Sequence, residues 1–254
     1  MESLLIIKNI LDKIKLHPLF YIVVIISLFT GHFRELIYFT IIIIVHELGH
    51  SITALLLGYK LNKIEIYPYG GCSNVEHEIN ILLFKELLIL LMGPIIQIIF
   101  VLIVYLLKLG VKEYFYTFNK IILIFNLLPI YPLDGGRILN IILNYIFSYY
   151  KALKISIYTS YFFFIVGFIS LLLINRNLIV LLVAISLGIN IYREIKKVDY
   201  YYNKFLLERY LNNYKFKKMK TISGYKDMYR DYLHLFLCDK KIIKEKDYLK
   251  RYYM

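Results

Sequence analysis

The sequence predicts an all-α polytopic membrane protein with about six transmembrane helices. Its hydrophobic fraction of 59% and its mean hydropathy of +0.62 exceed what a water-soluble globule of 254 residues can bury. The apolar residues also gather in runs that approach or exceed the length needed to cross a bilayer, which is about 20 residues. Composition and run length together therefore predict a bundle of membrane helices.

The apolar runs place the helices along the chain. They cover residues 18–31, 35–57, 81–108, 115–131 with a continuation beyond Arg137, 155–174 and 178–192. Six spans return the chain to the side on which it starts. We therefore expect a transmembrane domain over residues 1–192 and a basic cytoplasmic tail over residues 193–254.

Lys and Arg residues in the flanking segments set the orientation, because cytoplasmic loops carry an excess of both. Ten of them fall on one predicted side and five on the other, which predicts an integral multi-pass protein with both termini in the cytoplasm. The ten are Lys8, Lys13, Lys15, Lys60, Lys63, Lys151, Lys154, Arg193, Lys196 and Lys197, and the five are Arg34, Lys108, Lys112, Lys120 and Arg176. The two cysteines, Cys72 and Cys238, both fall on the cytoplasmic side and argue against a disulfide framework.

The second predicted helix contains the sequence His-Glu-Leu-Gly-His at residues 46–50, between the apolar runs 41–45 and 54–57. Ionisable groups inside a membrane helix are costly and usually functional. His46 and His50 are four residues apart and share one helix face, where two imidazoles can bind one Zn²⁺. Glu47 is rotated by about 100° around the helix, so it can approach the open side of the metal and act as general base on a water molecule.

A catalytic zinc ion takes a third protein ligand, and Asp134 is the candidate. It lies in the segment 126–138, where Pro129 and Pro132 cannot continue a regular helix and Gly135 and Gly136 permit unusual dihedral angles. Interrupted backbone at membrane depth is tolerated only where protein or a wet cavity covers it, as in an active site. The alternative is a loop between two helices with an exposed turn carboxylate.

The two motifs together resemble the site-2 protease family of intramembrane zinc metalloproteases, peptidase family M50. The resemblance pairs residues 46–50 with Asn126, Pro129, Pro132 and the run 133–136, and it covers about residues 15–192. It implies one Zn²⁺ per chain, bound by His46, His50 and Asp134. It further implies that Glu47 is the catalytic base and that Asn126 orients the substrate or the oxyanion.

The short spacer between the motifs and the lack of an inserted PDZ domain resemble the sporulation branch of that family. This likeness implies regulated intramembrane proteolysis of a membrane-associated substrate near the cytoplasmic face, namely a pro-sigma factor. Members of that branch are held inactive by partner membrane proteins. Relatives often carry a C-terminal nucleotide-sensing CBS domain, but the tail of this chain is too short and too basic for a complete one.

Two further segments match features of the family. Met92-Gly93-Pro94 resembles its small-Gly-Pro motif, in which Gly93 allows tight packing on the zinc helix; the alternative is an ordinary Pro-kinked membrane helix. Residues 63–74 alternate polar and apolar side chains into a Gly-Gly turn, which predicts a small β-hairpin after the catalytic helix. In the family this region resembles a membrane-dipping sheet that binds the substrate as an added strand; a plain surface turn is the alternative.

The tail carries 17 Lys plus Arg and 8 Asp plus Glu, and hence 9 of the 13 net positive charges. Such a segment suits the anionic surface of the lipid bilayer or an acidic substrate domain. Nucleic acid is an unlikely partner, because no recognition motif accompanies the charge. Periodic apolar positions predict small helices in the tail, against the alternative of a solvated segment lying on the membrane. These positions are Tyr225, Met228, Tyr232, Leu235 and Phe236.

A second class of function competes with the protease, namely a metal-handling transporter or a catalytically silent zinc-binding membrane protein. Transport predicts several acidic or histidine sites along a pathway through the membrane. In this sequence one cluster dominates, which favours the hydrolase.

Overall fold

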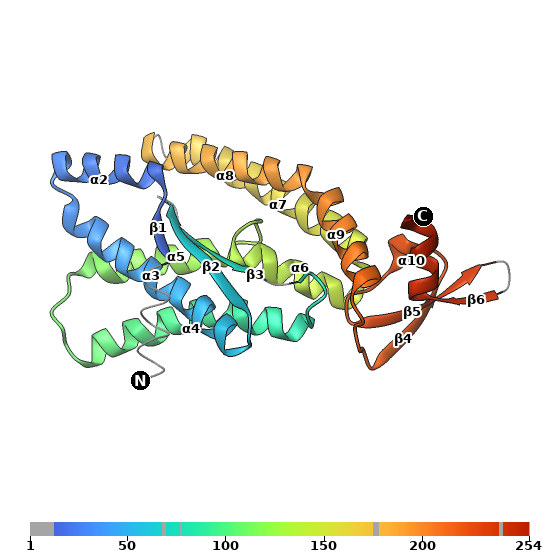
Figure 1. Ribbon diagram of the computed structural model, residues 1–254. Coiled ribbons are helices and arrows are strands. Elements are labelled where there is room, and N and C mark those ends of the chain that lie inside the picture. The colour runs from blue at the N-terminus through green and yellow to red at the C-terminus, as the bar shows by residue number, and fades with distance from the viewer. Residues whose placement is uncertain (1–12, 68–69, 77, 175–177, 239–240, 254) are drawn as a thin grey trace. The chain divides into compact units, whose positions relative to one another are not determined.

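The computed structural model describes residues 13–67, 70–76, 78–174, 178–238 and 241–253 (Figure 1). The chain forms two compact units. The first comprises residues up to 77 together with 87–127, and the second comprises residues 78–86 together with those from 128 onward.

The first unit contains the helix with the histidine motif. Its helices are α2 (Pro18–Thr30), α3 (Phe33–Leu56), α4 (Leu83–Leu106, whose first turn belongs to the second unit) and α5 (Glu113–Asn126). Side chains from all of these helices and from the sheet meet in one apolar core, so α3 is held on several sides. The buried members are Phe20, Ile42, Ile43, Ile66, Val104, Phe115 and Ile122.

A three-stranded sheet packs on α3. Its strands are β1 (Ile14–Leu16), β2 (Lys60–Tyr67) and β3 (Gly70–Glu76), and β2 pairs in parallel with β1 and antiparallel with β3. Leu61 and Ile64, which lie on either side of an irregularity in β2, are both buried against Leu48 and Leu55 of α3. The hairpin signal at residues 63–74 thus lies in the β2 and β3 ladder, and its depth in a membrane stays a prediction.

The second unit begins, after residues 78–86, at the interrupted segment that precedes α6 (Asp134–Ile146). The long helices α7 (Tyr149–Ile174) and α8 (Leu178–Lys196) follow. The predicted helix over 115–131 therefore ends at Asn126, and a new helix starts at Asp134. Prolines at 129 and 132 account for the break, as the sequence predicts.

Among the described residues, three helices are long and apolar enough to cross a membrane: Phe33–Leu56, Leu83–Leu106 and Tyr149–Leu173. The apolar stretch Phe20–Thr30 is shorter. The large apolar side chains exposed on the spanning helices fit this assignment, because lipid solvates them as well as a protein core does. They include Leu102, Leu106 and Leu173.

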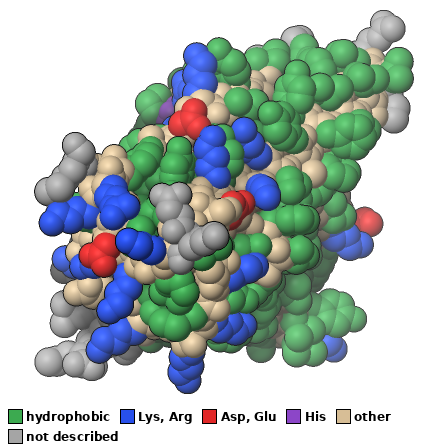
Figure 2. Space-filling view, turned by 90° about the vertical axis from the view of Figure 1, so that its right-hand side faces the viewer, with side chains coloured by type: hydrophobic (Ala, Val, Ile, Leu, Met, Phe, Trp, Pro, Cys, Tyr) green, Lys and Arg blue, Asp and Glu red, His purple; other side chains and the backbone are tan. Residues whose placement is uncertain are grey.

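The tail folds into a small α/β domain, which we call the C-terminal domain (residues 198–253). It comprises α9 (Val198–Leu211), β4 (Lys218–Ile222), the 3₁₀ turn η1 (Tyr225–Asp227), β5 (Tyr232–Cys238), β6 (Lys241–Lys244) and α10 (Glu245–Tyr253). Strand β5 pairs in parallel with β4 and antiparallel with β6. On the face drawn in Figure 2, many blue Lys and Arg side chains and few red Asp and Glu side chains are visible.

This domain corrects two expectations. A second sheet makes the fold mainly helical rather than all-α, and of the five apolar positions expected in small helices only Tyr225 lies in one, the short 3₁₀ helix η1. Tyr225 is in η1, Met228 follows it, and Tyr232, Leu235 and Phe236 are in β5. The aromatic-rich run of β5 is well suited to a half-buried strand, and its residue Phe236 is fully buried among Phe205, Leu206 and Leu249 of the helices.

A buried arginine joins the segment 78–86 to the C-terminal domain. Arg209 of α9 donates from Nε to Asn80 Oδ1 at 2.5 Å, and from its terminal nitrogens to the carbonyls of Tyr229, Arg230 and Tyr232. Asn80 donates in turn to the Phe205 carbonyl at 3.1 Å. These bonds satisfy a guanidinium that has no exposed surface, so the segment and the domain form one folded body.

The start of α4 is anchored to the same domain. Arg230 forms a 2.7 Å ion pair with Glu86, and Asp231 accepts a hydrogen bond from the backbone of Leu83 at 3.3 Å. An acidic side chain near a helix N-terminus is favourable, because it meets the unpaired backbone N–H groups there. The first turn of α4 is thus held by the C-terminal domain.

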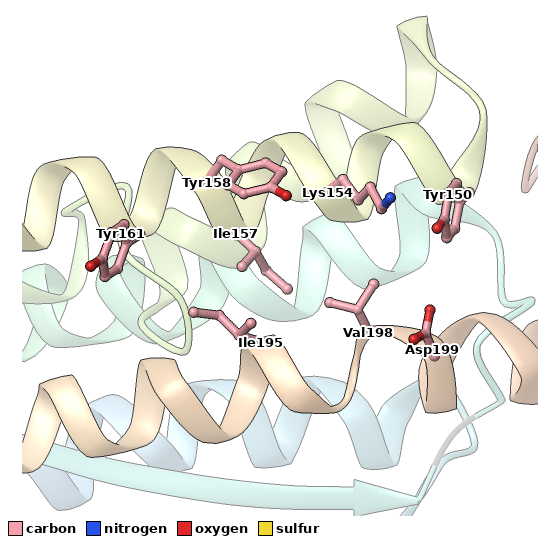
Figure 3. A pocket seen from close by; sticks show the side chains of 8 residues that line it. All are labelled: Tyr150, Lys154, Ile157, Tyr158, Tyr161, Ile195, Val198 and Asp199. Atoms are coloured by element: carbon pink, nitrogen blue, oxygen red, sulfur yellow. The ribbon is translucent and has the colours of Figure 1, made fainter.

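A cavity of about 360 Å³ lies between α7 and the junction of α8 and α9 (Figure 3). Its walls combine tyrosine rings and isoleucines with one amine and one carboxylate. None of the predicted site residues lines it. The lining residues are Tyr150, Lys154, Ile157, Tyr158, Tyr161, Ile195, Val198 and Asp199.

Candidate zinc site

The motif on α3 forms one buried cluster. His46, Glu47 and His50 are 2%, 5% and 4% exposed, and each offers a ligand atom within 4.8 Å of the others. The two imidazoles come from successive turns of one helix, and their Nε2 atoms are 3.1 Å apart. The sequence spacing therefore brings all three side chains together, as predicted.

The other ring nitrogen of each histidine has a defined partner. His46 Nδ1 lies 2.8 Å from Gln97 Oε1, and His50 Nδ1 lies 2.8 Å from the carbonyl oxygen of Ile89. Carbonyl oxygens only accept hydrogen bonds, so both Nδ1 atoms carry the proton. Both Nε2 atoms then have the lone pair that a metal needs.

This donor set fits zinc. A tetrahedral ion at about 2.0–2.1 Å from two imidazole nitrogens holds them about 3.3–3.4 Å apart, close to the observed 3.1 Å. Each ligand also donates its second ring N–H to a protein oxygen, which is the arrangement that usually orients metal-binding histidines. Glu47 adds a carboxylate from the same helix.

Helix α4 approaches α3 closely at the site. A Cβ atom at Gly49 would lie 2.9 Å from the Cα of Gly93, and a Cβ at Gly93 would overlap the imidazole of His50. Only glycine leaves room at both positions. This confirms the prediction that Gly93 permits tight packing on the zinc helix.

Strand β3 approaches the same cluster from the sheet. A Cβ atom at Gly71 would lie 2.6 Å from both Cδ and Oε1 of Glu47. Gly71 pairs with Ile66 in the ladder, so the sheet backbone itself faces the carboxylate. The absence of a side chain at position 71 leaves the room that the Glu47 side chain occupies.

The two remaining predicted residues lie in different units. Asn126 is the last residue of α5, is partly buried, and belongs to the same unit as the histidines. Asp134 is the first residue of α6, is 8% exposed, and belongs to the second unit. Its role as third zinc ligand and the role of Asn126 stay predictions.

The segment before Asp134 is fixed by local hydrogen bonds. Leu133 donates its backbone N–H to the carbonyl of Ile130 at 2.8 Å, and the Tyr131 N–H donates to the hydroxyl of Ser160 on α7 at 2.8 Å. Backbone groups freed by the helix break are therefore satisfied by protein, as membrane burial requires. These hydrogen bonds fix the backbone just before Asp134, the first residue of α6.

Sequence reasoning missed Gln97 and Asn119. Gln97 is 0% exposed on α4, and its amide nitrogen donates to the side chain and the backbone carbonyl of Asn119 on α5. Gln97 lies in the otherwise apolar stretch Ile-Ile-Gln-Ile-Ile, and Asn119 lies between Phe118 and Lys120, just before the apolar run 121–125. Attention to neutral amides inside membrane helices, in addition to ionisable groups, would have found them.

Comparison with known proteins gives the family. The sequence model described as Peptidase family M50 matches residues 35–114 and 111–168. Stage IV sporulation protein FB of Bacillus subtilis (strain 168) is 30% identical over 209 residues, which cover 80% of this chain and 73% of that protein. Zinc metalloprotease MJ0392 of Methanocaldococcus jannaschii is 36% identical over 123 residues, covering 45% of this chain and 35% of that protein.

A solved structure gives the same result. The Site-2 Protease from Methanocaldococcus jannaschii superimposes with a TM-score of 0.57 at 29% sequence identity, covering 71% of this chain and 89% of that chain. The matches span the zinc helix and the helices packed on it. Together with the buried His-Glu-His cluster, they identify the chain as a member of peptidase family M50, an integral membrane zinc metalloprotease.

Proposed function

We propose that the chain hydrolyses a peptide bond of a membrane-associated protein near the cytoplasmic face, with His46, His50 and Asp134 as zinc ligands. The observation that supports this most directly is the pair of Nε2 atoms 3.1 Å apart beside Glu47. Both imidazoles have their Nδ1 protons committed to protein oxygens. One helix thus supplies both the two imidazoles that would bind the metal and the carboxylate that would transfer the proton.

Each residue has a defined task. Bound zinc supplies the acidity, since it lowers the pKa of a water molecule to about 7 and polarises the peptide carbonyl. Glu47 accepts the proton from the attacking water and donates it to the nitrogen of the leaving peptide. The amide of Asn126 orients the substrate carbonyl or stabilises its developing negative charge.

We assign a pro-sigma factor as the substrate and sporulation as the setting. The likeness to Stage IV sporulation protein FB supports this, because it extends over 80% of the chain. We further assign six membrane spans with both termini in the cytoplasm. The excess of Lys and Arg on one side supports the orientation, which brings the basic tail to the side of a cytoplasmic substrate.

The substrate enters as an extended strand beside β3. A helical segment has to unwind before its peptide bond is accessible, and its backbone groups then need partners inside the membrane. In the described part of the sheet, β2 pairs on one side of β3 and the other side is an edge, which suits strand addition. The close approach of Gly71 on β3 to Glu47 supports this mode of entry, because a strand added beside β3 would lie near the proposed general base.

The test is Glu47→Gln in the full chain, co-expressed with candidate pro-sigma factors. Loss of a general base lowers the rate by about 10²–10⁴-fold, so the shortened product should disappear while zinc content stays near one per chain. Glu65→Gln on β2 is the matched control and should cleave normally. Cleavage by Glu47→Gln at the unmodified rate would reject the assignment of the base, and intact pro-sigma factor with the unmodified chain would reject the substrate.

A further inference from the structure

Two buried amides join the zinc helix to its neighbours. Gln97 is 0% exposed on α4 and Asn119 is 9% exposed on α5. Gln97 Oε1 lies 2.8 Å from His46 Nδ1, while Gln97 Nε2 lies 2.7 Å from Asn119 Oδ1 and 3.1 Å from the Asn119 backbone carbonyl. The three residues thus form a hydrogen-bonded relay across three helices.

Asn119 determines which way the amide of Gln97 faces. Its backbone carbonyl can only accept, so the Gln97 group that meets it has to be the NH₂ group. The Oδ1 atom of Asn119 accepts the second N–H of the same group. The carbonyl oxygen of Gln97 therefore faces His46.

That orientation selects one tautomer of His46. Facing a carbonyl oxygen, Nδ1 carries the proton and Nε2 keeps its lone pair. A reversed amide would present its NH₂ group to Nδ1, which would then accept, and the proton would move to Nε2. The protonated Nε2 could not bind a metal.

We propose that Gln97 and Asn119 are positioning residues for the metal: they hold His46 in the tautomer and ring orientation that bind zinc through Nε2. The proposal rests on the assignment of His46 as a ligand. Such hydrogen-bond partners of ligands typically contribute 10–100-fold to metal affinity. Gln97 has no exposed surface, so water does not readily take its place and the dependence should be strong.

His50 differs because its partner is a backbone carbonyl, that of Ile89. No side-chain substitution removes that acceptor. The Nδ1 atom of His46, in contrast, faces a side-chain amide, so a substitution can remove its partner. Metal affinity should accordingly respond to substitutions at 97 and 119.

The experiment measures zinc affinity of the full detergent-solubilised chain by competition with a chelator, together with the visible spectrum of the Co²⁺ form. Gln97→Leu should weaken zinc binding by 10–100-fold and alter the Co²⁺ bands. Gln97→Glu keeps an oxygen facing His46 and should restore most of the affinity. Asn119→Leu should weaken binding less, and the double variant Gln97→Leu/Asn119→Leu no more than Gln97→Leu alone, because both act through one relay.

Thr40→Val on α3 is the matched control, since it removes a 2.7 Å side-chain hydrogen bond to Leu36 on the zinc helix without involving a ligand. It should leave affinity and spectrum unchanged. If His46→Ala abolishes zinc binding and Gln97→Leu leaves affinity within twofold, the relay is refuted and the ligand assignment stands. If His46→Ala retains zinc, the ligand assignment itself fails. Should Gln97→Leu not fold, an affinity of Asn119→Leu equal to that of the unmodified chain would overturn the proposal, because loss of the Asn119 acceptors should weaken zinc binding.

Discussion

Replacing Arg209 by glutamine should detach the segment 78–86 and unfold the C-terminal domain. The side chain of Arg209 has no exposed surface and bonds to Asn80, to three backbone carbonyls and to Glu245 at 3.5 Å. Burial lowers its pKa to about 10, yet it stays charged at neutral pH. Glutamine cannot reach these acceptors, so the carboxylate of Glu245 loses its cationic partner.

The magnitude follows from the burial. Breaking a buried ion pair by removing one partner costs about 3–5 kcal/mol, because the other charge is left without compensation. Small domains have a total stability of about 5–15 kcal/mol, so this loss is a large part of what holds residues 198–253 together. Local unfolding of the C-terminal domain should become common at temperatures where the membrane helices are intact.

Limited proteolysis of the full chain in detergent measures this directly. Arg209→Gln should be cut within residues 198–253 at least tenfold faster than the unmodified protein, since 1.4 kcal/mol already shifts an opening equilibrium tenfold when cleavage follows opening. Arg251→Gln removes an exposed arginine of α10 and is the matched control. Equal cutting rates for the two variants would show that the buried network contributes little.

Three further changes test other parts of the structure. Asp134→Asn should lower zinc retention by removing a charged ligand, and unchanged zinc content by metal analysis would exclude Asp134 from the site. Gly93→Ala should reduce zinc content and activity because the new Cβ overlaps the imidazole of His50, whereas Gly167→Ala on α7, where the Cβ meets nothing within 4 Å, should preserve both. Lowering the pH should destabilise the C-terminal domain through His234. Burial lowers the pKa of this histidine, and the positive charges of Arg209 and Lys220 lower it further, whereas the hydrogen bond to Glu245 acts in the opposite direction. Its Nε2 accepts the Tyr229 N–H, so the neutral ring is bound. The folded pKa is below the unfolded value of about 6.5, so this stability is present above pH 6.5 and lost as the pH falls through the folded value. Between pH 7.5 and 5, the Tm of thermal unfolding should therefore fall less steeply in His234→Gln than in the unmodified chain. Parallel Tm profiles for the two proteins would argue against a role of His234 in the pH dependence.

The part of the site on α3 could be predicted because its geometry is local. His46, Glu47 and His50 lie on two successive turns of one helix, and the helix period alone brings them together. The break before Asp134 was likewise predictable, because Pro129 and Pro132 act on their own backbone.

The C-terminal domain could not be predicted in the same way. Its central contact joins Arg209 to Asn80, residues that are 129 positions apart. The parallel pairing of β4 with β5 likewise joins residues from separate segments of the chain, such as Lys218 and Tyr232. Periodicity in one sequence says which face of a segment is apolar, but it does not say which distant segment covers that face.

The closeness of the two imidazole nitrogens has a consequence for how the chain acquires its metal. The 3.1 Å between the two Nε2 atoms is already near the spacing that zinc imposes, so the two histidines should rearrange little when zinc binds. The free energy of coordination should then go into holding the ion and not into folding the site.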